Sequence, residues 1–204
     1  MKIIFARHGE SVANVLRVFS NFLSHPLTAK GIHQAQELSQ RLQGQSFHQV
    51  YTSPVQRAVE TCQIICAALA QPFTITEALR EYDVGKFEGT SDPAGWQVYE
   101  DVLHSWMERQ EWDLSMPGGE TFNDMRRRFI PFIQSLVAEN HLPEAQYLLV
   151  SHGGLLRCML PQIAANITPA FSMQHPIGNT ETVTLETQDG GLICTDWCGN
   201  IPSL

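Results

Sequence analysis

The chain has 204 residues, 43% of them hydrophobic, and a formal net charge of -8, which is typical of a single soluble globular domain with room for an insertion. No apolar run approaches the ~20 residues of a membrane span, and the opening MKIIFARHGE lacks the longer apolar region of a secretory signal. We therefore expect a cytoplasmic protein with no membrane contact, and the acidic balance disfavours nonspecific binding to nucleic acid.

The first half of the chain alternates short apolar runs, typical of buried strands, with helical patterns. In chain order we expect a strand at 2–6, a helix from Thr28 to near Gly44, a strand at 49–53 and a helix from Ser53 to about Ala70. Thr28 and Ser53 are the expected N-caps, and Pro54 suits a first helical position.

The second half continues this alternation after one interruption. In chain order we expect a strand at 73–79, a helix at 96–112, a helix opened by a capping box of Thr121 and Asp124 and kinked at Pro131, a strand from Tyr147, a helix from about Leu155, and strands at 181–187 and 191–197. Together these elements predict a three-layer α/β sandwich with a mostly parallel central sheet flanked by helices. We expect a single domain over 1–204, with a small helical lid insertion at about 83–120.

Two histidine–glycine pairs directly follow predicted strands, in RHGE at 7–10 and in SHGG at 151–154. Open α/β sheets bind ligands beyond the carboxyl ends of their strands. A glycine beside each histidine, such as Gly153, lets a substrate approach the backbone, and a helix that starts there points N–H donors at an anion. Both places therefore suit a phosphate group, with His8 and His152 beside it.

Arg57 lies one turn into a helix that also follows a strand, in SPVQRAVET, so it can reach the same pocket. Arg7, Arg57 and the two histidines would neutralise a dianionic phosphoryl group. The same cations would keep His8 neutral, with a lone pair free to attack phosphorus. Each element alone has an ordinary structural explanation, but their joint occurrence favours phosphoryl transfer through a phosphorylated His8.

Five segments carry a resemblance to a known family: RHGESVAN, PLTAKGIHQA, SPVQRAVET, LREYDVGKFEG and SHGG. Over nearly its whole length the chain resembles the histidine phosphatase superfamily of phosphoglycerate mutase-like proteins. The resemblance implies His8 as the nucleophile, Glu81 as the proton donor, and a phosphate pocket of Arg7, Asn14, Arg57, His152 and Gly153. Because Arg7, Arg57 and the histidines supply positive charge and the sequence has no carboxylate cluster suited to Mg²⁺, we expect no metal and no cofactor.

The short insertion ending in PGGET and the segment SNFLS resemble the broad-specificity and ribazole phosphatase branches. Phosphoglycerate mutases of the family are usually longer and carry an Arg-Arg pair in the insertion. The resemblance therefore implies a metal-independent phosphoric monoester hydrolase, similar to histidine acid phosphatases, acting on a small phosphorylated metabolite. Two alternatives stay open, namely mutase-type phosphoryl transfer and a non-catalytic module that recognises phosphorylated partners.

Several features leave the substrate open. His25 and Lys86 depart from the residues common in the family, and His175 could face the site or not. Four aromatic residues in or near the insertion could line a pocket, although packing inside the lid is the favoured interpretation; they are Trp96, Tyr99, Trp106 and Trp112. The arginines at 126–128 are interpreted as a solvated helix face rather than a nucleic-acid patch. The oligomeric state is not predicted.

Overall fold

The computed structural model describes residues 1–138 and 144–202. Its strands are β1 (Lys2–Arg7), β2 (Gln49–Thr52), β3 (Thr74–Ile75), β4 (Gln146–Ser151), β5 (Thr182–Gln188) and β6 (Gly191–Trp197). Its α-helices are α1 (Val12–Leu16), α2 (Ala29–Arg41), α3 (Gln56–Leu69), α4 (Pro93–His104), α5 (Phe122–Ala138), α6 (Gly153–Met159) and α7 (Pro169–Gln174). The expected domain range of 1–204 includes 139–143 and 203–204, which lie outside the described residues.

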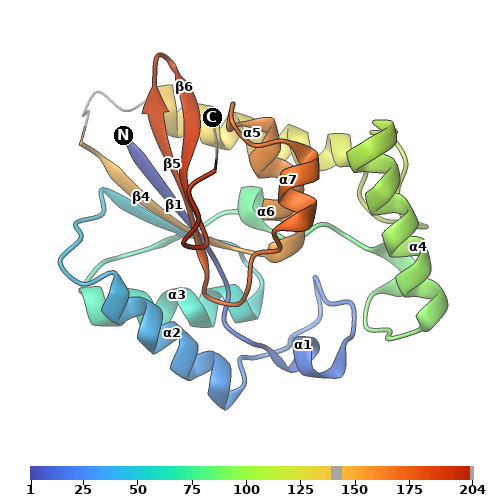
Figure 1. Cartoon of the computed structure of the whole chain (residues 1–204). Coiled ribbons are helices and arrows are strands. Elements are labelled where there is room, and N and C mark those ends of the chain that lie inside the picture. Colours follow the sequence, from blue (N-terminus) through green and yellow to red (C-terminus); the bar gives the residue numbers. More distant parts are fainter. Residues whose placement is uncertain (139–143, 203–204) are drawn as a thin grey trace.

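The strands form a six-stranded sheet in the order β3-β2-β4-β1-β5-β6. The first four strands of that order run parallel to one another, whereas β5 pairs antiparallel with both β1 and β6. Helices α2 and α3 lie on one side of the sheet and α5, α6 and α7 on the other (Figure 1). The expected α/β sandwich with a mostly parallel sheet is therefore confirmed.

Alternating side chains of β1 serve the two hydrophobic layers. Ile4 and Ala6 pack with the buried residues of α2 and α3, whereas Ile3 and Phe5 pack with those of α5 and α6. All four are at most 5% exposed, which explains why the strand reads as a continuous apolar run instead of alternating with polar residues. The two layers hold the carboxyl end of β1 in a fixed place.

Two expected elements start or end differently. The strand expected at 73–79 is only the two-residue β3, because the Thr76 hydroxyl accepts a hydrogen bond from Ala78 N (3.3 Å) and begins a 3₁₀ turn at Glu77–Leu79. Helix α3 starts at Gln56 and not at Ser53. The Ser53 hydroxyl accepts a hydrogen bond from Val55 N (3.2 Å) in the turn that precedes the helix.

The helix expected at 96–112 begins earlier, because Asp92 accepts a hydrogen bond from Ala94 N (3.1 Å) and Pro93 occupies the first turn. After α4 a π-helical turn follows at Ser105–Arg109. The capping box at the start of α5 is confirmed, since Thr121 N donates to Asp124 Oδ2 (2.9 Å) and Asp124 N to Thr121 Oγ1 (3.0 Å).

The segment expected as a lid insertion, at about 83–120, has its two ends joined by backbone hydrogen bonds. Glu120 N donates to Asp83 O (2.9 Å) and Lys86 N to Pro117 O (3.0 Å). Gly85 has a φ of +59°, and a Cβ there would lie 2.3 Å from Pro117 O, so the close approach of the two chain segments requires glycine. Helix α4, which lies between these two ends in the sequence, extends away from the sheet (Figure 1).

None of the helices within 1–138 and 144–202 combines the length and the apolar character that a membrane-spanning helix needs.

Candidate active site

The carboxyl ends of β1 and β4 bring the two histidines together. Arg7 pairs in register with Ser151, and His8 N donates to Ser151 O (3.0 Å). The rings of His8 and His152, one residue beyond each strand, have centroids 5.1 Å apart. The convergence expected from the sequence is therefore present in the fold.

Arg57 connects these two rings. Its Nε donates to His8 Nε2 (2.9 Å), and its Nη2 lies 3.1 Å from His152 Nδ1. The same Nη2 donates to Ser20 O (2.8 Å), and the side chain is 4% exposed. Burial lowers the pKa of Arg57 to about 10, so the guanidinium remains charged at neutral pH.

A guanidinium can only donate hydrogen bonds, so both ring nitrogens that face Arg57 must accept. The remaining ring nitrogens then carry the protons, an assignment that follows from the hydrogen-bond network. His8 Nδ1–H donates to Gly9 O (2.7 Å), and His152 Nε2–H donates to the Ser53 hydroxyl (2.7 Å). Both imidazoles are neutral, and the lone pair of His8 Nε2 points toward the Arg57 guanidinium.

The electrostatic environment favours the same state. Burial lowers the pKa of His8 well below its usual value, and the charges of Arg57 and Arg7 lower it further. The sequence analysis attributed the neutral His8 to these cations, but burial is the larger cause. The pKa of His152 is lowered by burial and then by Arg57.

The other predicted phosphate contacts surround His8. Arg7 Nη1 donates to Ile177 O (2.7 Å), while Arg7 Nε is buried and has no hydrogen-bond partner among the described residues. A Cβ on Gly153 would lie 3.2 Å from Arg7 Nε, so a side chain there would crowd the guanidinium. Asn14 Oδ1 accepts a hydrogen bond from Ser11 N (3.1 Å), which orients the amide.

Glu81 caps the N-terminus of α6. Its carboxyl oxygens accept hydrogen bonds from Gly154 N (2.9 Å) and Leu155 N (2.6 Å), two of the N–H groups that have no partner within the first turn of a helix. In the sequence, Glu81 follows the strand candidate at 73–79 and precedes the turn at Gly85. The structure adds that the helix start carrying Gly153 also fixes the predicted acid.

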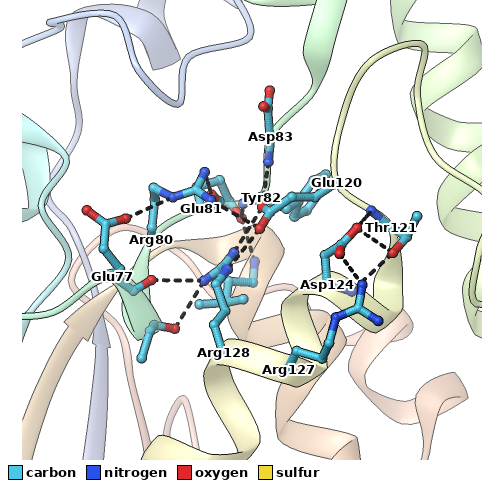
Figure 2. Close-up of polar contacts among 12 residues, drawn as sticks. Glu77, Arg80, Glu81, Tyr82, Asp83, Glu120, Thr121, Asp124, Arg127 and Arg128 are labelled. Atoms are coloured by element: carbon cyan, nitrogen blue, oxygen red, sulfur yellow. Dashed lines mark hydrogen bonds and ion pairs between the residues drawn. The ribbon is translucent and has the colours of Figure 1, made fainter.

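Figure 2 shows the polar network behind Glu81. Glu120 accepts hydrogen bonds from Arg80 Nη2 (3.1 Å) and from Arg128 Nε (3.0 Å), and Arg80 Nη1 donates to Glu81 O (3.3 Å). The side chains of Arg128 and Glu120 are each 15% exposed. The interpretation of 126–128 as a solvated face is therefore wrong for Arg128, which helps to fix the segment that carries Glu81.

Two other carboxylates near the site have different partners. Glu10 contacts Lys30 Nζ and the Thr28 hydroxyl, both at 2.9 Å. Glu88 accepts backbone N–H bonds from three consecutive residues, 21–23, at 2.8–3.0 Å. Glu88 thereby holds the loop whose Ser20 carbonyl bonds to Arg57.

These residues surround a cavity of about 240 Å³, room enough for a small molecule. The predicted residues that line it are Arg7, His8, Asn14, Arg57, Glu81 and Gly153. His152 is 0% exposed and reaches the cavity through Arg57. His175 is exposed, stacks on Phe171 with ring centroids 4.2 Å apart, and does not line the cavity.

Several lining residues were not assigned to the site from the sequence. They are Ser20, Asn21, Tyr82, Arg157 and Ile177, together with Trp96 and Tyr99, which had been favoured as lid packing. Trp106, by contrast, is 1% exposed and belongs to the core. The i, i+3 spacing of Trp96 and Tyr99 is the one sequence signal that could have separated this pair from Trp106 and Trp112.

The family follows from comparison with known proteins. Residues 3–199 match the histidine phosphatase superfamily (branch 1). The chain belongs to this superfamily. The 2,3-bisphosphoglycerate-dependent phosphoglycerate mutase of Brucella canis is 34% identical over 164 residues, which are 78% of this chain and 79% of the mutase.

Solved structures extend the similarity of this superfamily member to its whole length. The alpha-ribazole phosphatase from Shigella flexneri is 25% identical with a TM-score of 0.79, covering 100% of this chain and 96% of that one. YhfR from Bacillus stearothermophilus is 26% identical with a TM-score of 0.82, covering 98% and 97%. Similar proteins thus include both a phosphatase and a mutase.

The lowered pKa values of His8 and His152 predict a pH-dependent stability. Below about pH 6.5 the unfolded chain binds protons on these histidines that the folded chain excludes. The free energy of unfolding should therefore fall between pH 7 and pH 5, by up to about 1.4 kcal/mol per pH unit for each histidine. Urea denaturation at pH 7, 6 and 5 measures this slope. His152→Asn should make it shallower, whereas the exposed His33→Asn should not, and equal slopes in all three proteins would contradict the assignment.

Proposed function

We propose that this protein is a phosphatase that hydrolyses phosphate monoesters of small molecules through a phosphohistidine on His8. The observation that carries the proposal is the state of the His8 ring. Gly9 O holds the proton on Nδ1, and Nε2 presents its lone pair to the donor side of Arg57. That lone pair accepts the hydrogen bond from Arg57 Nε, so attack requires Arg57 to pass its donors from His8 to the phosphoryl oxygens, which frees the neutral ring nitrogen as a nucleophile.

In the proposed mechanism, Arg7, Arg57 and Asn14 bind the phosphoryl oxygens and His8 Nε2 attacks phosphorus. The P–N bond forms as the P–O bond to the leaving group breaks. Glu81, which lines the same cavity, gives a proton to the leaving oxygen. The Glu81 carboxylate then takes a proton from water as the water oxygen attacks phosphorus. The P–N bond breaks, inorganic phosphate leaves, and His8 is neutral and Glu81 protonated again. His152 orients Arg57 through Nδ1.

Mutase-type transfer is the second candidate, because the Brucella canis protein of that name is 34% identical. Hydrolysis is favoured by the short insertion and by the whole-length similarity to a ribazole phosphatase. Incubation with 3-phosphoglycerate and a trace of 2,3-bisphosphoglycerate separates the two candidates. A phosphatase releases inorganic phosphate, whereas a mutase forms 2-phosphoglycerate with little release.

The phosphohistidine gives the first test of this function. Enzyme incubated with a ³²P-labelled ester and quenched in alkaline detergent should carry label that survives base and is lost in acid, as expected for a phosphohistidine. His8→Ala should carry none, because it lacks the ring that would be phosphorylated. His175→Ala, a matched change at an exposed histidine, should label like the wild type. Equal labelling of His8→Ala would exclude His8 as the nucleophile.

The role of Glu81 is tested through the basicity of the leaving group. Glu81→Gln keeps the size of the side chain but cannot donate a carboxyl proton, so it should slow an alkyl phosphate by about 10²–10⁴-fold. A nitrophenyl phosphate should slow far less, because nitrophenolate leaves without protonation. Steady-state and burst kinetics of both esters provide the measurement. Equal slowing, with phosphorylation of His8 limiting for both, would leave Glu81 a purely structural cap of α6.

We also propose that the reaction needs no metal ion. Arg7, Arg57 and the helix start at Gly153 provide positive potential for the phosphate, and within 1–138 and 144–202 no three His, Cys, Asp or Glu side chains cluster as metal ligands. Treatment with a chelator should leave the rate of phosphate release unchanged. A large loss that a divalent ion restores would overturn this part of the proposal.

A further inference from the structure

Helix α6 arranges the cavity along its axis. Gly153 lies against Arg7, and a Cβ on Gly154 would meet the Glu81 carboxylate at 2.8 Å. Arg157, one turn further along, lines the same cavity. At 1.5 Å per residue, its backbone lies about 6 Å beyond Gly153. The helix therefore presents a phosphate-binding end, then the predicted acid, then a second cation.

Arg157 lacks an anionic partner. Its Nη2 donates to the Tyr99 hydroxyl (3.1 Å), its Nε is buried without a partner, and it forms no ion pair with the carboxylates of the described residues. The groups that raise its pKa are Tyr99, Tyr82 and Cys158, which are uncharged at neutral pH. A largely buried charge is costly unless it is paired.

Two further polar groups, Tyr99 and Asn21, line the cavity. Burial raises the pKa of Tyr99, so its hydroxyl keeps its proton at neutral pH, and the oxygen accepts from Arg157 Nη2 (3.1 Å). Asn21 is 2% exposed, lines the cavity, and has no hydrogen-bond partner for either side-chain amide atom among the described residues. A buried amide without partners indicates a polar ligand.

The aromatic rings that line the cavity pack against one another in pairs. Phe19 and Trp96 stack on each other with centroids 4.1 Å apart, and Tyr82 stacks on Tyr99 with centroids 6.1 Å apart. These contacts hold the ring of Tyr99 and its hydroxyl in place.

Resting on the proposed phosphatase function, we propose that Arg157 and Tyr99 form a second anion site for the leaving group. The substrates are then small phosphate monoesters whose alcohol carries another anionic group, a carboxylate or a second phosphate, a few atoms from the ester oxygen. Burial lowers the pKa of Arg7, and the charge of Arg157 lowers it further. A substrate with an anion at each end relieves this repulsion. Arg157 determines specificity and takes no part in bond breaking.

Three esters with a matched three-carbon skeleton test this site: propyl phosphate, 3-(phosphonooxy)propanoate and propane-1,3-diyl bisphosphate. Wild-type kcat/KM should favour one or both anionic esters over propyl phosphate by about 10- to 100-fold, as expected for a charge-assisted hydrogen bond. The two anionic esters distinguish a carboxylate from a second phosphate. Arg157→Gln should remove this preference, measured as the ratio of kcat/KM for each anionic ester to kcat/KM for propyl phosphate with the same variant.

Arg17→Gln removes the same charge from an exposed position at the surface and should keep the preference. If Arg157→Gln fails to fold, Tyr99→Phe serves as the second variant and should lower the preference by about threefold or more. The inference is overturned if the wild type shows no preference, or if either variant slows all three esters by one factor. The proposed function survives that result if propyl phosphate still labels His8. No hydrolysis of any of the three esters, nor of nitrophenyl phosphate, would overturn both.

Discussion

The site depends on one buried guanidinium that can only donate hydrogen bonds. Arg57 contacts a nitrogen of both His8 and His152, and each contact requires an acceptor on the imidazole. One side chain thereby sets two tautomers and fixes where the lone pair of His8 lies. Buried arginines usually pair with a carboxylate. The side-chain hydrogen bonds of Arg57 to charged or titratable groups go instead to two neutral imidazoles.

The fold keeps this arrangement rigid by placing each partner at the end of an element. His8 and His152 extend β1 and β4, whose registers are fixed by buried layers on both faces of the sheet. Glu81 is held differently, by the N-terminus of α6 in front and by the Arg80–Glu120–Arg128 network behind (Figure 2). Strand register positions the histidines, and side-chain ion pairs position the carboxylate.

Sequence reasoning predicted the parts that have a local signature. The apolar runs before His8 and His152 and the capping box at Thr121 have fixed spacings, so their elements could be read directly. Ser53 was mistaken for a helix cap because a Ser-Pro pair has the same appearance whether its hydroxyl serves a helix or contacts His152. The contact with His152, which is 99 residues away in the sequence, decides between the two roles of the hydroxyl, and the local sequence carries no sign of that contact.

The missed residues share one property, which is that their roles come from distant partners. The sequence around Arg128 is typical of a solvated helix face, whereas in the structure the side chain donates to Glu120. Arg157 and Tyr99 are 58 residues apart and meet only in the cavity. The outer part of the site is built from such pairs, so it could not be derived from spacing.

The hydrogen bonds between Asp83 and Glu120 and between Lys86 and Pro117 close the insertion at its base. Everything between these anchor points is a loop whose ends are fixed independently of its contents. Tyr99 lies inside that loop, whereas Glu81 lies just outside it. Changes of length or sequence within this segment therefore alter the part of the cavity that Trp96 and Tyr99 line, while His8, Arg57 and Glu81 keep their positions.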